Sequence, residues 1–248
     1  MKDKQKIPLS IIIITYNEEE NLENLLKTLK RQTVYPAEII VSDANSTDNT
    51  LNIAKEYGCI ITEGGKPPVG RNNGAKVALQ ERLLFLDSDI IPYPNKFLEY
   101  IYQETNEKKY DCTTCDNFPR SKKTKYECIF FLYNWVQRFS QHTNMPIASG
   151  TCIYSTKSAF NSVGGFPTNM EYGEDSKFVR LVKKNGFSFG VLEKPKVFVS
   201  VRRFETDGTK KTLERAILFY FTRDKKIKYK FGHHNNNHDN HNNKQSNI

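Results

Sequence analysis

The sequence predicts a single α/β domain with a mostly parallel sheet flanked by helices. Its 248 residues are enough for one sizeable core without division into two domains. Apolar runs of strand length alternate with segments of helical periodicity as far as about residue 115. The helical segments are long enough to return the chain to a parallel neighbouring strand, so we expect right-handed βαβ units.

The first strand is predicted at residues 9–14, a nearly continuous run of β-branched residues typical of a strand buried on both faces. A helix follows, and Asn17 is a candidate N-cap with Glu20 three residues further on. The apolar residues of this helix recur at i, i+3, i+4 and i+7: Leu22, Leu25, Leu26 and Leu29. This spacing predicts one apolar stripe packed against the sheet.

The second strand is predicted at residues 38–42 and ends at Asp43. The next segment, 46–58, opens with hydroxyl and acidic residues that favour a helix N-terminus. It closes on Gly58, where a C-terminal capping glycine is expected. Residues 59–62 predict a short third strand.

A glycine-rich segment, EGGKPPVGRNNG at residues 63–74, separates the third strand from a further helix. It fits neither of the common phosphate-binding glycine patterns, and we expect a mobile loop over a ligand. Residues 83–86 predict a fourth buried strand, which runs directly into Asp87 and Asp89.

Charge and cysteine content restrict the class of protein. The 37 Lys and Arg against 28 Asp and Glu give a net charge of +9, which suits partners that carry phosphate. Five scattered cysteines do not suggest a secreted disulfide framework, so a cytoplasmic protein is expected. No window reaches the roughly 18 apolar residues needed to span a bilayer. No stacking platform or basic recognition helix in the main domain supports binding of nucleic acid.

Polar residues follow three of the predicted strands. Parallel α/β sheets place their chemistry beyond the carboxyl ends of the strands. In this chain those ends carry Thr15, Tyr16, Asn17, Asp43, Asp87 and Asp89. Each of these residue types is also common in turns and caps, but their gathering at one edge favours a binding site.

The D-x-D tripeptide at the end of the fourth strand suits a hard divalent cation. Mg²⁺ and Mn²⁺ take few carboxylate oxygens from the protein and complete their shell with water and substrate phosphates. One acid can bind the metal while the other reaches a ligand hydroxyl. A bare D-x-D is frequent by chance, and its position after four apolar residues is what favours a metal site.

The chain resembles the family-2 inverting glycosyltransferases, which have the GT-A nucleotide-diphospho-sugar fold. The resemblance covers roughly residues 7–205 in family order. It rests on the segments IIIITYNEEENLENLLKTLKRQT, EIIVSDANSTDNT, GRNNGA, LLFLDSDIIP, VGGFP and GEDSKFVRLVKKNG. It implies one glycosyltransferase domain at 1–205, with a nucleotide-binding half at 7–115 and an acceptor-side half at 116–205.

The resemblance also implies roles for individual residues. Thr15, Tyr16 and Asn17 would line the nucleotide, and Asp43 would accept a hydrogen bond from its base. Arg71 would lie near the nucleotide, and Asp87 would face the ribose or the sugar. Asp89, with Asp87 beside it, would hold Mn²⁺ or Mg²⁺ on the diphosphate. Asp175, with Glu174 beside it, would be the general base, and a UDP-sugar is the favoured donor.

The chemistry of sugar transfer gives independent support to these assignments. The leaving diphosphate develops negative charge, which a metal and cationic side chains stabilise. Arg202 and Arg203, at the end of the apparent strand KVFVSV, are candidate guanidinium contacts to phosphate. A single positioned carboxylate is enough to deprotonate the acceptor hydroxyl, which implies one displacement and inversion. Glu174 and Asp175, at the start of a predicted helix, also have a structural explanation, because acids there face the positive end of the helix dipole.

Two segments indicate apolar or membrane contacts. Residues 126–139 are predicted to form a strongly aromatic helix. This helix either belongs to the core or to a lid over the acceptor side, or it forms an apolar groove for a lipid-linked acceptor. Residues 206–231 are predicted to form a helical extension, which is basic and amphipathic within 209–230. This extension either docks on the domain or lies on an anionic membrane, at the inner face of the bilayer. Residues 232–248 are rich in Asn and His and are predicted to be disordered.

Two alternatives to a glycosyltransferase stay open on the residues. A nucleotidyltransferase would need a glycine- and arginine-rich loop after the first strand, where TYNEEENL is acidic and lacks glycine. The second alternative is a catalytically inactive protein that binds membrane surfaces through its basic residues.

Overall fold

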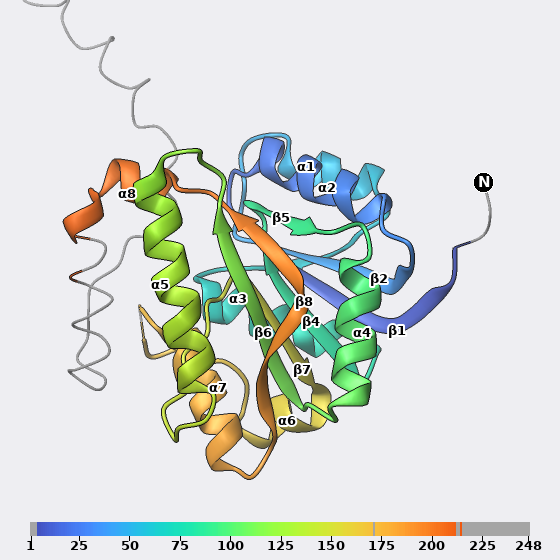
Figure 1. The fold of residues 1–248 in the computed structure, drawn as a ribbon. Coiled ribbons are helices and arrows are strands. Elements are labelled where there is room, and N and C mark those ends of the chain that lie inside the picture. Colours follow the sequence, from blue (N-terminus) through green and yellow to red (C-terminus); the bar gives the residue numbers. More distant parts are fainter. Residues whose placement is uncertain (1–3, 171, 212–213, 215–248) are drawn as a thin grey trace, which may run out of the picture.

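A computed structural model of the chain describes residues 4–170, 172–211 and 214. One eight-stranded sheet with strand order β3-β2-β1-β4-β7-β6-β8-β5 runs through it, with helices on both faces (Figure 1). The strands are β1 (Lys6–Thr15), β2 (Tyr35–Asp43), β3 (Ile60–Glu63), β4 (Arg82–Asp87), β5 (Ile90–Tyr93), β6 (Cys112–Pro119), β7 (Cys152–Thr156) and β8 (Phe189–Val199). The helices are α1 (Glu19–Lys30), α2 (Thr50–Glu56), α3 (Pro67–Val77), α4 (Phe97–Glu107), α5 (Thr124–Ser140), α6 (Lys157–Ser162), α7 (Glu174–Lys184) and α8 (Arg202–Thr206).

The first four strands form the predicted parallel unit. β1 pairs in parallel with β2 and β4, and β2 pairs in parallel with β3. The register sets Thr15 opposite Asp43 and Ile14 opposite Asp87. The carboxyl ends of three strands therefore meet at one edge, as the sequence predicts.

The second half of the sheet is mixed. β7 lies antiparallel between β4 and β6, and β8 pairs in parallel with β6 but antiparallel with β5. Four of the seven strand pairings are thus parallel, which fits a mostly parallel sheet. The predicted boundary between residues 115 and 116 falls inside β6, and the two proposed halves share this one sheet.

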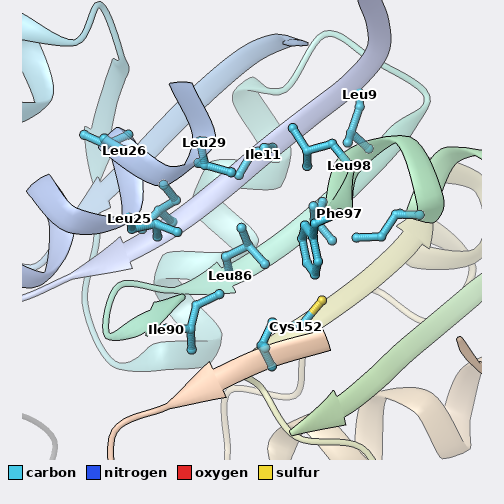
Figure 2. Packing of buried hydrophobic residues seen from close by; sticks show 14 of the residues in the cluster. Leu9, Ile11, Leu25, Leu26, Leu29, Leu86, Ile90, Phe97, Leu98 and Cys152 are labelled. Atoms are coloured by element: carbon cyan, nitrogen blue, oxygen red, sulfur yellow. The ribbon is translucent and has the colours of Figure 1, made fainter. Parts of the chain in front are cut away.

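Two apolar cores sandwich the sheet because successive side chains of β1 point to opposite faces. Ile11 and Ile13 pack with α1, α2 and α4, whereas Ile12 packs on the other face with α3, α6 and α7. Figure 2 shows the first core, in which Leu25 and Leu29 of α1 lie over β1 and β4. The predicted stripe on α1 is fully buried.

Asn17 does not cap α1, contrary to the sequence prediction. The helix begins at Glu19 with Glu18 in the N-cap position, and Asn17 adopts a left-handed backbone with φ of 51°. Asn is among the few residues with a side chain that tolerate this conformation. The turn at Asn17 redirects the chain between β1 and α1.

Most of the glycine-rich segment is a helix and not the expected loop, and only residues 64–66 are irregular. α3 begins at Pro67, which suits a first helical turn because proline there sacrifices no hydrogen bond. Gly70 and Gly74 face the sheet, and a Cβ at Gly74 would lie 2.4 Å from Ile12 Cγ2. These glycines let α3 lie directly on β1 and β2, and the close packing outweighs their low helix propensity.

The ends of the described chain differ in part from the predictions. β8 stops at Val199, and the two arginines expected at a strand end open the short helix α8. α7 opens on Glu174 and Asp175, and Gly186 adopts a left-handed conformation just after its end. Most of the predicted 206–231 extension and all of the 232–248 tail lie outside the described residues.

Candidate active site

The ends of β1 and β2 are joined by a buried hydrogen-bond network. The Thr15 hydroxyl donates to Asp43 Oδ1 at 2.9 Å. Ser46 donates its backbone N–H to Asp43 Oδ2 at 2.8 Å and its hydroxyl to Oδ1 at 2.5 Å. A carboxylate has roughly four acceptor positions, so these three bonds leave one for a donor group on a ligand.

Asn17 ties this network to the loop after β2. Its backbone N–H donates to Ser46 Oγ at 2.8 Å, and its Oδ1 accepts from the Thr47 N–H at 2.8 Å. Tyr16 lies half-buried between Thr15 and Asn17. The structure therefore brings Thr15, Tyr16, Asn17 and Asp43 together as one wall of a site.

Arg71 links two further predicted residues that are far apart in the chain. From α3, its Nη2 donates to Asp87 Oδ1 at 2.9 Å and its Nη1 donates to Glu174 Oε1 at 2.9 Å. Nη2 also donates to the Gly150 carbonyl at 3.3 Å. The Arg71 side chain is only 4% exposed, so it holds these carboxylates and has little surface with which to contact a ligand.

The charge of Arg71 is maintained by its neighbours. Burial opposes the charged form, but the carboxylates of Asp87, Glu174 and Asp175 outweigh it and raise the pKa of Arg71. Gly150 is required beside it, because a Cβ there would lie 2.3 Å from Arg71 Nη2. The buried cation thus fixes the end of β4 against the start of α7.

Asp175 is partly buried at the first turn of α7. Its Oδ2 accepts the Gly150 N–H at 2.6 Å and its Oδ1 accepts the Ser176 N–H at 2.7 Å. Burial, and next the adjacent Glu174 carboxylate, raise the pKa of Asp175 to about 7, although Arg71 acts in the opposite direction. A carboxylate with this pKa can accept a proton near neutral pH.

Tyr133 of α5 lies close enough to Asp175 to interact with its charge. Its hydroxyl shares a hydrogen bond with Ser149, and burial together with the Asp175 charge raises its pKa well above the usual range. The phenol is therefore neutral at physiological pH. Ser149, its hydrogen-bond partner, directly precedes Gly150, whose carbonyl accepts from Arg71.

Asp89 lies in the turn between β4 and β5. Burial, and next the carboxylates of Asp87 and Glu18, raise the pKa of Asp89 to about 6, although the charges of Arg202 and Arg203 act in the opposite direction. Repulsion among these acids is the condition that a bound cation relieves.

The acids at this turn fit a Mg²⁺ or Mn²⁺ ion that keeps most of its shell for water and phosphate. Among the described residues, no group of three or more His, Cys, Asp or Glu side chains could hold a metal. Asp89 and Asp87 can supply one or two carboxylates, which is the small protein share expected for these ions at a diphosphate.

The two predicted arginines reach the same region from α8. Arg202 Nη2 lies 3.0 Å from Glu18 Oε1, across the start of α1. Both arginines lower the pKa of Asp89 through their charge. The structure therefore brings the short helix α8 to the rim that carries Asp89.

The sequence interpretation missed Glu18, Tyr133 and Gly150. Glu18 is one of three consecutive glutamates, and nothing in the run distinguishes it from its neighbours. Tyr133 was part of the aromatic 126–139 segment, where its inward direction depends on packing. Gly150 precedes β7, and only its distance from Arg71 shows the need for glycine.

This combination of a parallel half-sheet, acids at its carboxyl edge and a mixed second half defines a GT-A type glycosyltransferase fold. The family Glycosyl transferase family 2 matches residues 10–164 of the 248. The chain belongs to this family.

Curated relatives match part of the chain. Validoxylamine A glucosyltransferase of Streptomyces hygroscopicus subsp. limoneus is 36% identical over 35% of this chain and 21% of its own length. Poly(ribitol-phosphate) beta-N-acetylglucosaminyltransferase TarP of Staphylococcus aureus is 32% identical over 42% of this chain and 34% of its own. The matched part therefore spans about a fifth to a third of these relatives.

Solved structures share the fold over most of the chain. The mannosyltransferase PcManGT from Pyrobaculum calidifontis, in complex with GDP-Man and Mn²⁺, has a TM-score of 0.64 at 19% identity, covering 91% of this chain and 68% of its own. TarS 1–349 of S. aureus in complex with UDP has a TM-score of 0.59 at 21% identity, covering 86% and 66%.

Neither a membrane-spanning helix nor a disulfide occurs in the described part of the chain. Across residues 4–170, 172–211 and 214, no helix is long and apolar enough to cross a membrane. All five cysteines are free. The cytoplasmic location expected from the sequence stays a prediction.

Proposed function

We propose that this protein transfers a sugar from a nucleoside-diphosphate sugar to an acceptor hydroxyl by a single displacement with inversion. The observation that carries the proposal is the buried Arg71 bridge, which holds Asp87 of the D-x-D segment next to Glu174 and Asp175. A donor-side carboxylate and a candidate base are thereby fixed on one rigid unit. Family membership favours this activity over a nucleotidyltransferase or an inactive binding protein.

The donor lies, in this proposal, along the ends of β1, β2 and β4. Asp43 accepts from the nucleotide base, next to Thr15, Tyr16 and Asn17, and Asp87 faces the ribose or the sugar. A UDP-sugar is favoured because TarS has a UDP complex and a glucosyl-3-phosphoglycerate synthase structure contains Mn²⁺ and UDP. A divalent cation held by Asp89 and Asp87 would supply positive charge against the leaving β-phosphate oxygen.

The displacement itself needs one base. The acceptor oxygen bonds to the anomeric carbon as the bond from that carbon to the β-phosphate oxygen breaks, and the electron pair leaves with the nucleoside diphosphate. Asp175 takes the acceptor proton, and Arg202 and Arg203 approach the diphosphate from α8. Glu174 is paired with Arg71 and raises the pKa of Asp175, so Asp175 is the better placed base.

The Asp89→Asn variant tests the donor site. Mn²⁺ with UDP is expected to raise the Tm of the parent protein by several degrees, since a ligand at about 100 times its Kd adds about 2.7 kcal/mol to stability. In the variant the increment due to Mn²⁺ should vanish while UDP alone still binds weakly. Thermal unfolding and titration calorimetry with UDP, GDP and dTDP, each with and without Mn²⁺, give the measurement.

The unliganded variant is the control for this test. Because the pKa of Asp89 is raised in the fold, its charged form lowers stability above about pH 6, and asparagine should leave the Tm equal or slightly higher. If Mn²⁺ raised the Tm of the variant as much as that of the parent, the assignment of Asp89 to the metal would be contradicted.

The pH dependence of transfer should follow Asp175. The base acts in its ionised form, so kcat is expected to rise with pH and level off above about pH 7. Stability has the opposite slope: the raised pKa favours the protonated native state, so this contribution is complete below about pH 4 and is lost as pH rises through about 7. Rate measurements at saturating donor, beside Tm values at each pH, separate the two effects.

A further inference from the structure

The outward face of α5 carries an exposed apolar stripe. Its members are Phe131, Leu132, Trp135 and Phe139, with side chains 75%, 61%, 59% and 63% exposed, together with the exposed Cys128. At 3.6 residues per turn these five positions fall within about 100° of arc. Trp135 and Phe139 stack on each other, with ring centroids 5.9 Å apart and planes 9° from parallel.

The opposite face of α5 is the more polar one, which reverses the usual pattern of a surface helix. Toward the domain, Asn134 exchanges hydrogen bonds with the backbone of Asn117, and Gln137 donates to the Cys115 carbonyl. Tyr126 and Phe130 anchor the first turns against Phe204 of α8. The stripe is therefore not left over from core packing, and its size indicates a partner surface.

Basic residues cluster where α5 begins. Arg120, Lys122, Lys123 and Lys125 are exposed there, and Glu127 is the only acid in the first turn. Lys123 pairs with Glu205 at 3.1 Å, which leaves an excess of positive charge. Lys210 and Lys211, just after α8, are exposed as well. An anionic surface complements this arrangement.

Charge also decides among the possible occupants of the stripe. The basic segment 209–230 of this chain and a second copy of α5 would both bring positive charge against these lysines. A bilayer of anionic lipid instead offers negative headgroups to the lysines and an apolar boundary to the aromatic side chains, and Trp suits such an interface.

We propose that the exposed face of α5 binds the surface of an anionic lipid bilayer. Tyr133, on the inner side of the same helix, lies close to Asp175, so the bilayer would adjoin the acceptor side of the site. If the proposed function holds, this position suits an acceptor hydroxyl carried by a lipid. The bilayer contact itself does not depend on donor, metal or turnover.

Trp135 is the only tryptophan in the chain, so its fluorescence reports on this face alone. With the full-length protein and vesicles of phosphatidylcholine plus phosphatidylglycerol, its emission is expected to shift to shorter wavelength and to be quenched by brominated acyl chains. Phosphatidylcholine vesicles alone should give a much smaller response. No response to the anionic vesicles would overturn the proposal.

The variants keep Trp135 as the reporter. Phe131→Ser/Leu132→Ser should lower partition into anionic vesicles at least tenfold, about 1.4 kcal/mol, in sedimentation assays. The matched control is Leu79→Ser/Tyr93→Ser, which removes two exposed apolar side chains elsewhere and should leave partition unchanged. Far-UV circular dichroism checks the fold of each variant, and an equal loss in the control would contradict a specific face.

Two other results would assign the stripe to a different occupant and also overturn the proposal. Emission that is already at short wavelength and shielded from iodide without vesicles would mean that the chain covers its own stripe. Shielding that increases with protein concentration would mean that a second copy covers it.

Discussion

Replacing Asp175 with asparagine is expected to lower kcat by about 10²- to 10⁴-fold, the usual contribution of a positioned general base. The amide cannot take the acceptor proton, whereas its oxygen can still accept the Gly150 N–H that now reaches Asp175 Oδ2. Donor affinity should stay at the parental value because the proposed base contacts the acceptor and not the donor nucleotide. Single-turnover rates and calorimetry with the donor nucleotide give the two quantities.

The matched control is Glu174→Gln at the adjacent position. It removes the partner of Arg71 Nη1 and one cause of the raised Asp175 pKa, so its kcat should fall less and its pH profile should shift to lower pH. A larger loss in Glu174→Gln than in Asp175→Asn would reverse the two roles. A rate in Asp175→Asn near that of the parent would place the base elsewhere.

Replacing Arg71 with methionine is expected to lower the free energy of unfolding by about 3–5 kcal/mol, the cost of removing one partner of a buried ion pair. The variant leaves Asp87, Glu174 and Asp175 without the cation that now offsets their charges. In a domain of this size the Tm should fall by roughly 10 °C. Denaturant unfolding of the parent and the variant measures the difference.

Two comparisons separate electrostatics from packing in this variant. The loss in Arg71→Met should shrink as the pH is lowered from 8 to 5, because protonation of the carboxylates removes the unpaired charge. Lys27→Met breaks an ion pair with Glu23 in which both side chains are more than 40% exposed, and no measurable change in stability is expected. A loss in Arg71→Met that does not vary with pH would mean that Arg71 acts through its volume.

The sequence predicted the parallel half of the fold because that half is local. Each strand of the β1 to β4 unit is an apolar run of its own, and each crossing helix carries its own stripe or cap, as Leu22 to Leu29 and Gly58 show. The glycine-rich helix α3 was missed because Gly70 and Gly74 lower helix propensity, and only the nearby Ile12 and Ile14 side chains show what these glycines permit.

The individual residues of the candidate site were predicted, but the hydrogen bonds and ion pairs between them were not. Thr15 and Asp43 were expected at one edge, and the register of β1 on β2 places them opposite each other. The bridge from Arg71 to Asp87 and Glu174 spans 16 and 103 residues of sequence, and periodicity carries no information over such separations. Glu18 and Arg202, which are 184 residues apart, pair for the same reason.

Short-range patterns and motif order were enough to predict the class of fold, the family and the acids at the sheet edge. Three properties emerged only on folding: the burial of Arg71 between its carboxylates, the raised pKa of about 7 at Asp175 and the exposure of the apolar stripe of α5. Burial and charge proximity depend on all elements packed around a side chain, and those elements come from distant parts of the chain.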